Sequence, residues 1–105
     1  MVVYVDDMSA SFKPKHRPGR TYVMSHMIAD TDEELHEMAE RIGVVRKWFQ
    51  RDHYDITKSK RAQAVMCGAK EITWRQAGAM MFLKRKGYRM GSPATVEDRV
   101  KMFKG

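Results

Sequence analysis

The feature that most constrains the fold is the point in the first half of the chain where an apolar strand gives way to a helix. Residues 21–28 predict a strand. Thr31 then begins a helix, because its hydroxyl can accept from the third helical amide while Glu34 reaches back to the Thr31 amide. Apolar side chains follow at helical spacing, at Leu35, Met38, Ala39 and Ile42. Gly43 is a typical stop, so the pattern predicts a helix over residues 32–42.

Another strand is predicted at residues 2–5, which are β-branched or aromatic and end at Asp6 and Asp7. Residues 9–20 combine two Pro, one Gly and four Lys/Arg without apolar periodicity, which predicts a mobile basic loop. Because such a loop contains no crossover helix, the strand at 21–28 should run antiparallel to the first. Adjacent strand residues point to opposite faces, so we expect no more than one of the two Asp to face a single site, where it would bind a metal or orient a His.

The second half of the chain predicts three more helices. Thr57 is a cap for a helix that runs to about Cys67, and its apolar face would consist of Ala62, Val65, Met66 and Ala69. Thr73 and Gln76 form a second capping box, and the helix that they begin stops at Gly87. Residues 95–103 place apolar side chains on one side of a short C-terminal helix.

Together these elements predict the α+β class. We expect a small single domain over residues 1–90, in which two or three short strands pack against three main helices. Residues 91–105 would form a linker and a short C-terminal helix or tail, which could contact a second copy of the chain. A length of 105 residues leaves room for one modest core.

Composition predicts a cytoplasmic protein, in the host cytoplasm if a phage encodes it, with no membrane partner. No apolar run approaches the roughly 18 to 20 residues that span a bilayer, and the N-terminus has no signal-peptide pattern. Cys67 is the one cysteine, so it can form neither an intrachain disulfide nor a cysteine-based metal site. Its apolar surroundings predict a small buried residue, and Met24, Met27, Met38, Met66, Met80 and Met81 also stand at positions typical of a core.

Charge is distributed unevenly along this chain of net charge +7. Residues 1–55 hold ten Asp/Glu against eight Lys/Arg, whereas residues 56–105 hold three against twelve. Such a basic half suits an anion, whether a nucleic acid, a phosphorylated small molecule or an acidic protein, and it can equally be a solvated face. The helix start at Thr31 is followed by three carboxylates, so we expect an anion to bind elsewhere.

Polar residues at the edges of neighbouring elements predict one site. His26 lies near the end of the second strand and Asp30 follows it, and residues 53–55 repeat the pairing of imidazole with carboxylate in the sequence His-Tyr-Asp. The candidate ligand-binding residues are His26, Asp30, Trp48, His53, Tyr54, Asp55, Lys60 and Arg61. Arg can bind phosphate through two hydrogen bonds, and Trp48 offers a flat face on which a base could stack, although packing as a lid or in the core is the commoner role of such a residue.

The same motifs resemble a family of bacterial and phage proteins catalogued as domain of unknown function 4031. The resemblance covers roughly residues 2–76. It is carried by Tyr4-Val5-Asp6-Asp7, His26 to Thr31 with Glu33-Glu34-Leu35-His36, Arg41-Ile42-Gly43, Trp48-Phe49-Gln50, His53-Tyr54-Asp55, and Lys60-Arg61-Ala62 with Gly68-Ala69. The family label implies no particular chemistry.

Three functions fit these observations. The first is a binding protein for a phosphate-bearing ligand, such as a nucleotide, a signalling nucleotide or a nucleic acid. The second is a metal-dependent phosphoester hydrolase or nuclease, in which His26, Asp30, His53 and Asp55 would hold a divalent metal, the one cofactor that the sequence suggests. The third is a structural or protein-interaction module without a small ligand, in which the same residues fasten loops to helix ends.

Overall fold

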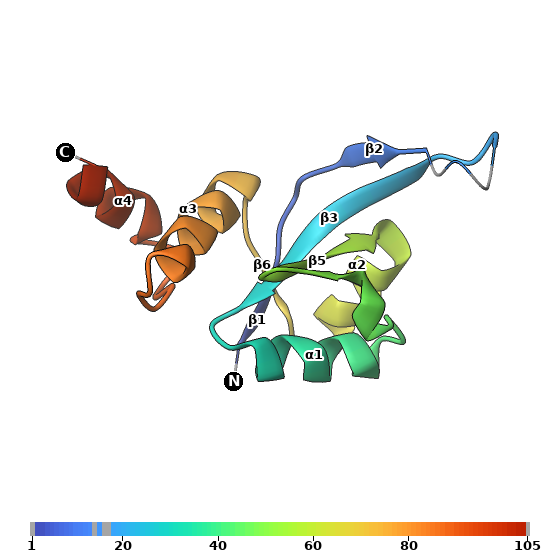
Figure 1. Ribbon diagram of the computed structural model, residues 1–105, viewed down its shortest axis with the longest axis horizontal. Helices are drawn as coiled ribbons and strands as arrows, with labels where there is room; N and C mark the ends of the chain where they lie inside the picture. The colour runs from blue at the N-terminus through green and yellow to red at the C-terminus, as the bar shows by residue number, and fades with distance from the viewer. Residues whose placement is uncertain (1, 14, 16–17, 105) are drawn as a thin grey trace.

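Six short strands form one mixed sheet in the computed structural model, which describes residues 2–13, 15 and 18–104 (Figure 1). Five of them lie in the order β4-β5-β3-β1-β6, and β2 pairs with the first half of β3. β1 and β6 run parallel, and the other pairs are antiparallel. The strands are β1 (Val3–Val5), β2 (Ala10–Phe12), β3 (Tyr22–Ala29), β4 (Phe49–Gln50), β5 (His53–Thr57) and β6 (Lys70–Glu71).

Four α-helices and one short 3₁₀ helix complete the fold. They are α1 (Asp32–Arg41), η1 (Arg46–Trp48), α2 (Lys58–Met66), α3 (Trp74–Arg85) and α4 (Val96–Lys104). The Thr73–Gln76 capping box of α3 forms in both directions as predicted. At α1 the Thr31 hydroxyl accepts from the Glu34 amide, but the Glu34 carboxylate contacts that hydroxyl and the amide of Val2 instead of the Thr31 amide.

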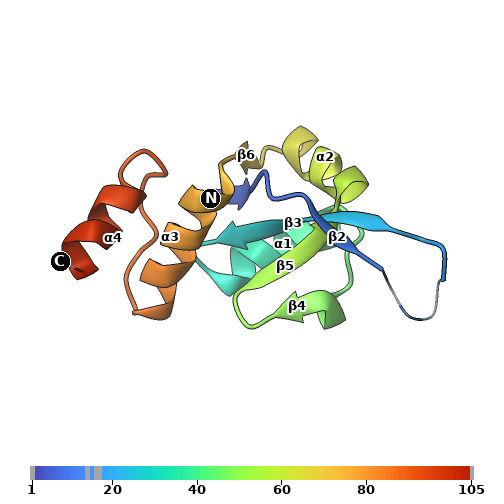
Figure 2. The same cartoon turned by 90° about the horizontal axis from the view of Figure 1, so that it is seen from above.

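The two faces of the sheet have separate apolar cores, because successive strand residues point to opposite sides. Strand residues such as Val5, Met27 and Tyr54 pack with Leu35 of α1 and Ala64 of α2 on one face. Tyr4 and Ile28 pack with α3 on the other face. Figures 1 and 2 show α1 beneath β3 and β5, and α3 and α4 together at one end of the sheet.

The α+β class is confirmed, and so is the antiparallel pairing of β1 with β3, in which Tyr4 lies opposite Ile28. The sheet has six strands where two or three were expected. Part of the predicted loop at residues 9–20 is β2, which adopts an extended form because β3 continues beyond β5 and offers it a partner. Pro14, His16 and Arg17 of that loop lie outside the described residues.

The predicted apolar face of α2 was wrong in its rotation. Ala64 and Ala69 are buried and Val65 is partly buried, but Ala62 is exposed and Met66 is 88% exposed. Cys67 is exposed as well, so the prediction of a buried thiol was also wrong. The helix ends at Met66, so Met66 and Cys67 lie exposed at its C-terminal end, before the chain re-enters the sheet at β6.

The C-terminal helix docks on α3. Val96 is fully buried, Val100 packs beside it, and the rings of Phe82 and Phe103 meet edge to face at 5.5 Å. Within the described residues, no helix has the length and apolar character needed to cross a membrane.

Candidate metal centre

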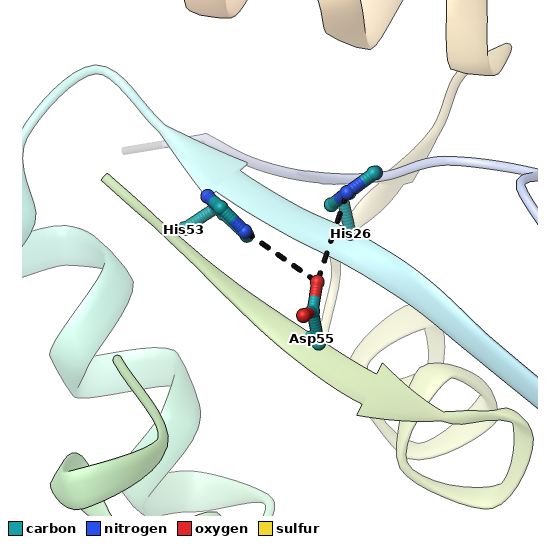
Figure 3. A group of neighbouring side chains, drawn as sticks. All are labelled: His26, His53 and Asp55. Carbon is teal, nitrogen blue, oxygen red and sulfur yellow. Dashed lines mark ion pairs between the residues drawn. The ribbon is translucent and has the colours of Figure 1, made fainter. Parts of the chain in front are cut away.

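His26, His53 and Asp55 gather on the face of the sheet that carries α3. His26 lies on β3 directly opposite Asp55 of β5, and His53 stands two residues before Asp55 on the same side of the strand. Figure 3 shows the three side chains pointing toward one another from the two strands. The pairing register therefore brings together residues that are 27 and 29 positions apart in the chain.

One carboxylate oxygen forms the centre of the group. Asp55 Oδ1 lies 3.7 Å from His26 Nε2 and 3.5 Å from His53 Nε2. The two rings meet edge to face with their centroids 5.1 Å apart. The exposed fractions of the side chains are 24% for His26, 13% for His53 and 31% for Asp55, so a small ligand or water can reach the group.

Asp6 orients the first histidine. Its buried carboxylate accepts from His26 Nδ1 at 2.8 Å and from the His26 backbone amide at 2.8 Å. The chain places Asp6 there because its own amide, just beyond β1, donates to the His26 carbonyl. The Asp6 carbonyl accepts in turn from Arg61 Nε at 2.7 Å. His26 is therefore held at both its backbone and its ring.

Asp52 orients the second histidine. Its carboxylate accepts from His53 Nδ1 at 2.9 Å and from Arg85 of α3 at 2.6 Å and 3.3 Å. Asp52 reaches this position through a tight turn, in which its amide donates to the Gln50 carbonyl and Arg51 adopts a φ of 61°. This is a γ-turn of the strained kind, which non-glycine residues rarely adopt.

Asp55 also has a supporting partner, because Gln50 Nε2 donates to its second oxygen at 3.0 Å. Each member of the group thus has a neighbour that fixes its orientation. Ligand sets for metal ions have this construction, in which a carboxylate accepts from the imidazole nitrogen that does not bind the metal.

The pKa values of these groups are coupled. The Asp55 carboxylate raises the pKa of His53 above the ordinary 6.5, Asp52 adds to this effect, and burial only partly offsets it. The same contact with His53 lowers the pKa of Asp55 below 3.8, against the opposing effect of burial. Burial also raises the pKa of Asp52, but hydrogen bonds from Arg85 and His53 outweigh it and hold the value below 3.8.

This hydrogen bonding fixes where the ring protons lie. Asp6 and Asp52 accept at Nδ1, so each neutral ring carries its hydrogen there and its lone pair on Nε2. Both lone pairs face the oxygen of Asp55, which is an acceptor when ionised. A cation between the three groups, either a proton or a metal ion, would be stabilised by all three.

The geometry fits a metal ion. Two ligand atoms each about 2.1 Å from an ion, at a tetrahedral angle, lie about 3.4 Å apart. The two nitrogen-to-oxygen separations are 3.7 Å and 3.5 Å, and a ligand atom of each residue lies within 4.8 Å of the others. The three residues could therefore hold a metal ion with small movements of the side chains.

The remaining predicted site residues lie elsewhere. Tyr54 points to the opposite face of the sheet, where it is buried and its hydroxyl bonds His36 Nδ1 at 2.7 Å. Asp30 accepts from the amide of Met90 at 2.9 Å. Lys60 Nζ donates to the Ile42 carbonyl at 2.7 Å, and Trp48 is half exposed on η1. Residues adjacent in sequence to the cluster are thus separated from it by strand alternation and by their own backbone partners.

Arg61 and the two N-terminal carboxylates have intermediate roles. Arg61 bonds the backbone of Asp6 and also the Glu71 carboxylate at 2.9 Å, so it touches the supports of the site. Asp6 faces His26, whereas Asp7 accepts from the amide of Trp74 at 2.7 Å. This separation follows the expected alternation of adjacent residues.

Sequence reasoning missed Asp52, Gln50 and Arg85. The pair Arg51-Asp52, which here forms the turn between two strands, was the available signal for Asp52. Arg85 is 33 residues from Asp52 and stands among other cations at a helix end, so no local pattern distinguished it.

Comparison with known proteins gives a family for the chain. No curated protein and no solved structure gives a significant match. A family model described as "Protein of unknown function (DUF4031)" matches residues 3–84, a range that includes Asp6, His26, Asp52, His53 and Asp55. Because this match covers most of the 105 residues, the chain belongs to the DUF4031 family.

Proposed function

We propose that His26, His53 and Asp55 bind one divalent transition-metal ion and that the protein uses this ion to hydrolyse phosphate esters. The observation that carries the proposal is the convergence of two Nε2 lone pairs and one carboxylate oxygen, each fixed from behind by another side chain. If these residues formed only a structural network, a proton shared among them would suffice and they could be closed to solvent. The three side chains are instead partly exposed, so water can reach them.

The donor set favours particular metals. Imidazole nitrogen suits Zn²⁺, Fe²⁺, Ni²⁺ and Cu²⁺, whereas Mg²⁺ and Ca²⁺ prefer oxygen ligands alone. Three protein ligands leave at least one coordination position for water, and a bound metal of this kind lowers the pKa of that water toward neutrality.

The charge of the chain favours an anionic substrate. A net charge of +7 raises the local concentration of phosphate esters around the protein. Arg85 lies behind His53 and remains 40% exposed, but its charge is paired with Asp52, so the charge of the whole chain and not that of the cluster supports an anionic ligand. The proposal keeps the phosphate-bearing ligand expected from the sequence and replaces the eight-residue pocket by a metal centre.

Metal binding is the first test. Protein stripped by a chelator should bind Zn²⁺ in a calorimetric titration with one ion per chain, and Co²⁺ should give visible absorption bands of a nitrogen- and oxygen-ligated ion. Asp55→Asn should lower the affinity by about 100-fold or more. Asp30→Asn is the matched control, because Asp30 has the same chemistry but lies outside the cluster and should leave affinity unchanged.

Turnover is the second test, with bis(p-nitrophenyl) phosphate as the substrate. We expect release of p-nitrophenol that depends on added Zn²⁺ or Mn²⁺ and stops in chelator. Asp55→Asn should abolish this release, whereas Asp30→Asn should preserve it. Metal binding without turnover would disprove the hydrolytic role and leave the metal site. Failure to bind Zn²⁺, Co²⁺ or Mn²⁺ would disprove both the metal site and the hydrolytic role.

A further inference from the structure

The strand β3 extends beyond the rest of the sheet to form an arm. β5 pairs with β3 only as far as Met24, and from there outward β2 is its partner, with Ala10 opposite Met24 and Phe12 opposite Tyr22. Figures 1 and 2 show this two-stranded ribbon projecting from the body on the side away from α3 and α4. We call the described residues of this ribbon and of its outer end, 9–13, 15 and 18–24, the arm.

The arm is strongly basic. Residues 9–29 contain four Lys/Arg and no Asp or Glu. Lys13, Lys15 and Arg20 of the arm are exposed, and none of the three forms an ion pair with a carboxylate of the described residues. At the opposite end of β3, α1 begins with Asp32, Glu33 and Glu34. One strand therefore joins a cationic end to an acidic end, and a polyanion would be attracted to the arm and repelled from α1.

The arm is also directed at the candidate metal centre. His26 follows Met24 by two residues on the same strand and on the same side of it. At about 3.3 Å per residue, Arg20 lies roughly 20 Å along the chain from His26. A ligand held along the arm would then meet His26 and Asp55 where β5 joins the sheet.

We propose that the arm binds double-stranded DNA by entering its major groove and contacting the flanking phosphates. A two-stranded β-ribbon fits the B-form major groove, which is about 12 Å wide, whereas the major groove of an RNA duplex is too narrow for side-chain access. Single strands are generally bound in concave grooves with stacked aromatic side chains, and the arm is a projection. The inference deepens the proposed function by naming its substrate, and it rests on that function for this step, although DNA binding itself needs no metal.

The test compares two triple variants with the same change of charge. One replaces Lys13, Lys15 and Arg20 of the arm by Ala. The matched control replaces three exposed cations from the basic half of the chain, Lys86, Arg89 and Lys101. Fluorescence anisotropy would measure binding of the metal-free proteins to a duplex of about 20 base pairs at about 100 mM salt.

We expect the arm variant to bind the duplex at least about 30-fold more weakly, and its plot of log affinity against log salt to be shallower by about 2 to 3. The control should lose no more than about threefold. Single-stranded DNA and duplex RNA of the same length should bind the unaltered protein more weakly than duplex DNA. Equal losses in the two variants, or equal affinity for single strands, would overturn the inference.

Hydrolysis of bis(p-nitrophenyl) phosphate separates this inference from the proposed function. The arm variant should retain turnover of this small substrate, because its residues lie away from the cluster. If no protein hydrolyses the small substrate but the arm still binds duplex DNA, the hydrolytic proposal fails and the DNA-binding surface stands. If turnover is present and duplex binding is absent, the DNA-binding inference fails and the hydrolytic proposal stands.

Discussion

The same strands form both faces of the sheet, but the two faces differ in how fully their side chains are buried. On the α1 and α2 face, Val5, Met27 and Tyr54 are fully buried in an apolar core. On the α3 face, apolar packing is followed along β3 by His26, which remains partly exposed together with His53 and Asp55. Because α3 covers only part of that face, polar groups can stay hydrated there. The comparison indicates that both faces contribute an apolar core, and that the α3 face also carries a partly exposed polar group beside its core.

The largest expected effect tests the apolar face. Leu35→Ala removes a fully buried side chain of α1 and should lower the free energy of unfolding by about 3 kcal/mol. Urea denaturation measures this change, and the affinity of the remaining folded protein for Zn²⁺ should stay the same. His53→Gln is the contrasting variant on the other face. An equal loss of stability in metal-free His53→Gln would show that the partly exposed polar group contributes as much to stability as the buried core does.

The next effect concerns the contact between α3 and the cluster. Arg85→Ala removes the guanidinium that bonds the buried Asp52 carboxylate and leaves the hydrogen bond from His53, among the residues that the structure describes. Since Arg85 is 40% exposed and screened by solvent, the loss of stability should be about 1 kcal/mol. Asp52 positions the ring of His53, so metal affinity should also fall, by about tenfold.

Arg85→Lys should recover part of that affinity, because the charge remains while the contact through two nitrogen atoms is lost. Nuclear magnetic resonance of the His53 ring would report its pKa, which should fall in Arg85→Ala if Asp52 loses its orientation. Reduced stability with unchanged metal affinity and unchanged His53 pKa would assign Arg85 to packing alone.

The smallest effect is the dependence of stability on pH in the metal-free protein. Asp52 and Asp55 have lowered pKa values, so their contribution is complete above 3.8 and is lost as the pH falls through the folded-state values. His53 has a raised pKa, so its contribution is complete below 6.5 and is lost as the pH rises through its folded-state value. The combined contribution of these three groups to the stability of the metal-free protein is therefore greatest under mildly acidic conditions.

Thermal unfolding from about pH 3 to about pH 9 measures this dependence. In chelator, Tm should decline on the alkaline side in the unaltered protein and decline less in His53→Gln. With Zn²⁺ present the alkaline decline should disappear, because metal binding requires neutral imidazole and displaces the proton. An alkaline decline of the same size in His53→Gln would assign the effect to other groups.

Local patterns in the sequence predicted the elements that depend on local contacts. Thr31 and Thr73 mark the starts of α1 and α3, because a capping hydroxyl bonds an amide only three residues away. His26, His53 and Asp55 were identified as candidates, but Asp30 and Tyr54 were grouped with them because nothing local fixes the register of β3 against β5. A shift of one residue in that register would have moved every side chain to the other face.

Long-range partners could not be predicted. The contact of Arg85 with Asp52 depends on how α3 lies across the sheet, and the parallel pairing of β6 with β1 joins residues more than 60 positions apart. The exposure of the C-terminal end of α2 could not be predicted for a similar reason. Met66 and Cys67 are apolar in type, but the packing of Ala64 against the core sets the rotation of the helix and leaves both exposed.

The parallel pairing of β1 with β6 has a consequence for synthesis of the chain. β1 lies between β3 and β6, so one of its edges has no partner until Lys70 and Glu71 have been translated. At about 5 to 20 residues per second, the ribosome takes roughly 3 to 13 seconds to travel from Val5 to Lys70. During that interval the apolar segment Val3–Val5 lacks the partner that covers this edge in the folded protein, and an unpaired strand edge is a site where chains can associate.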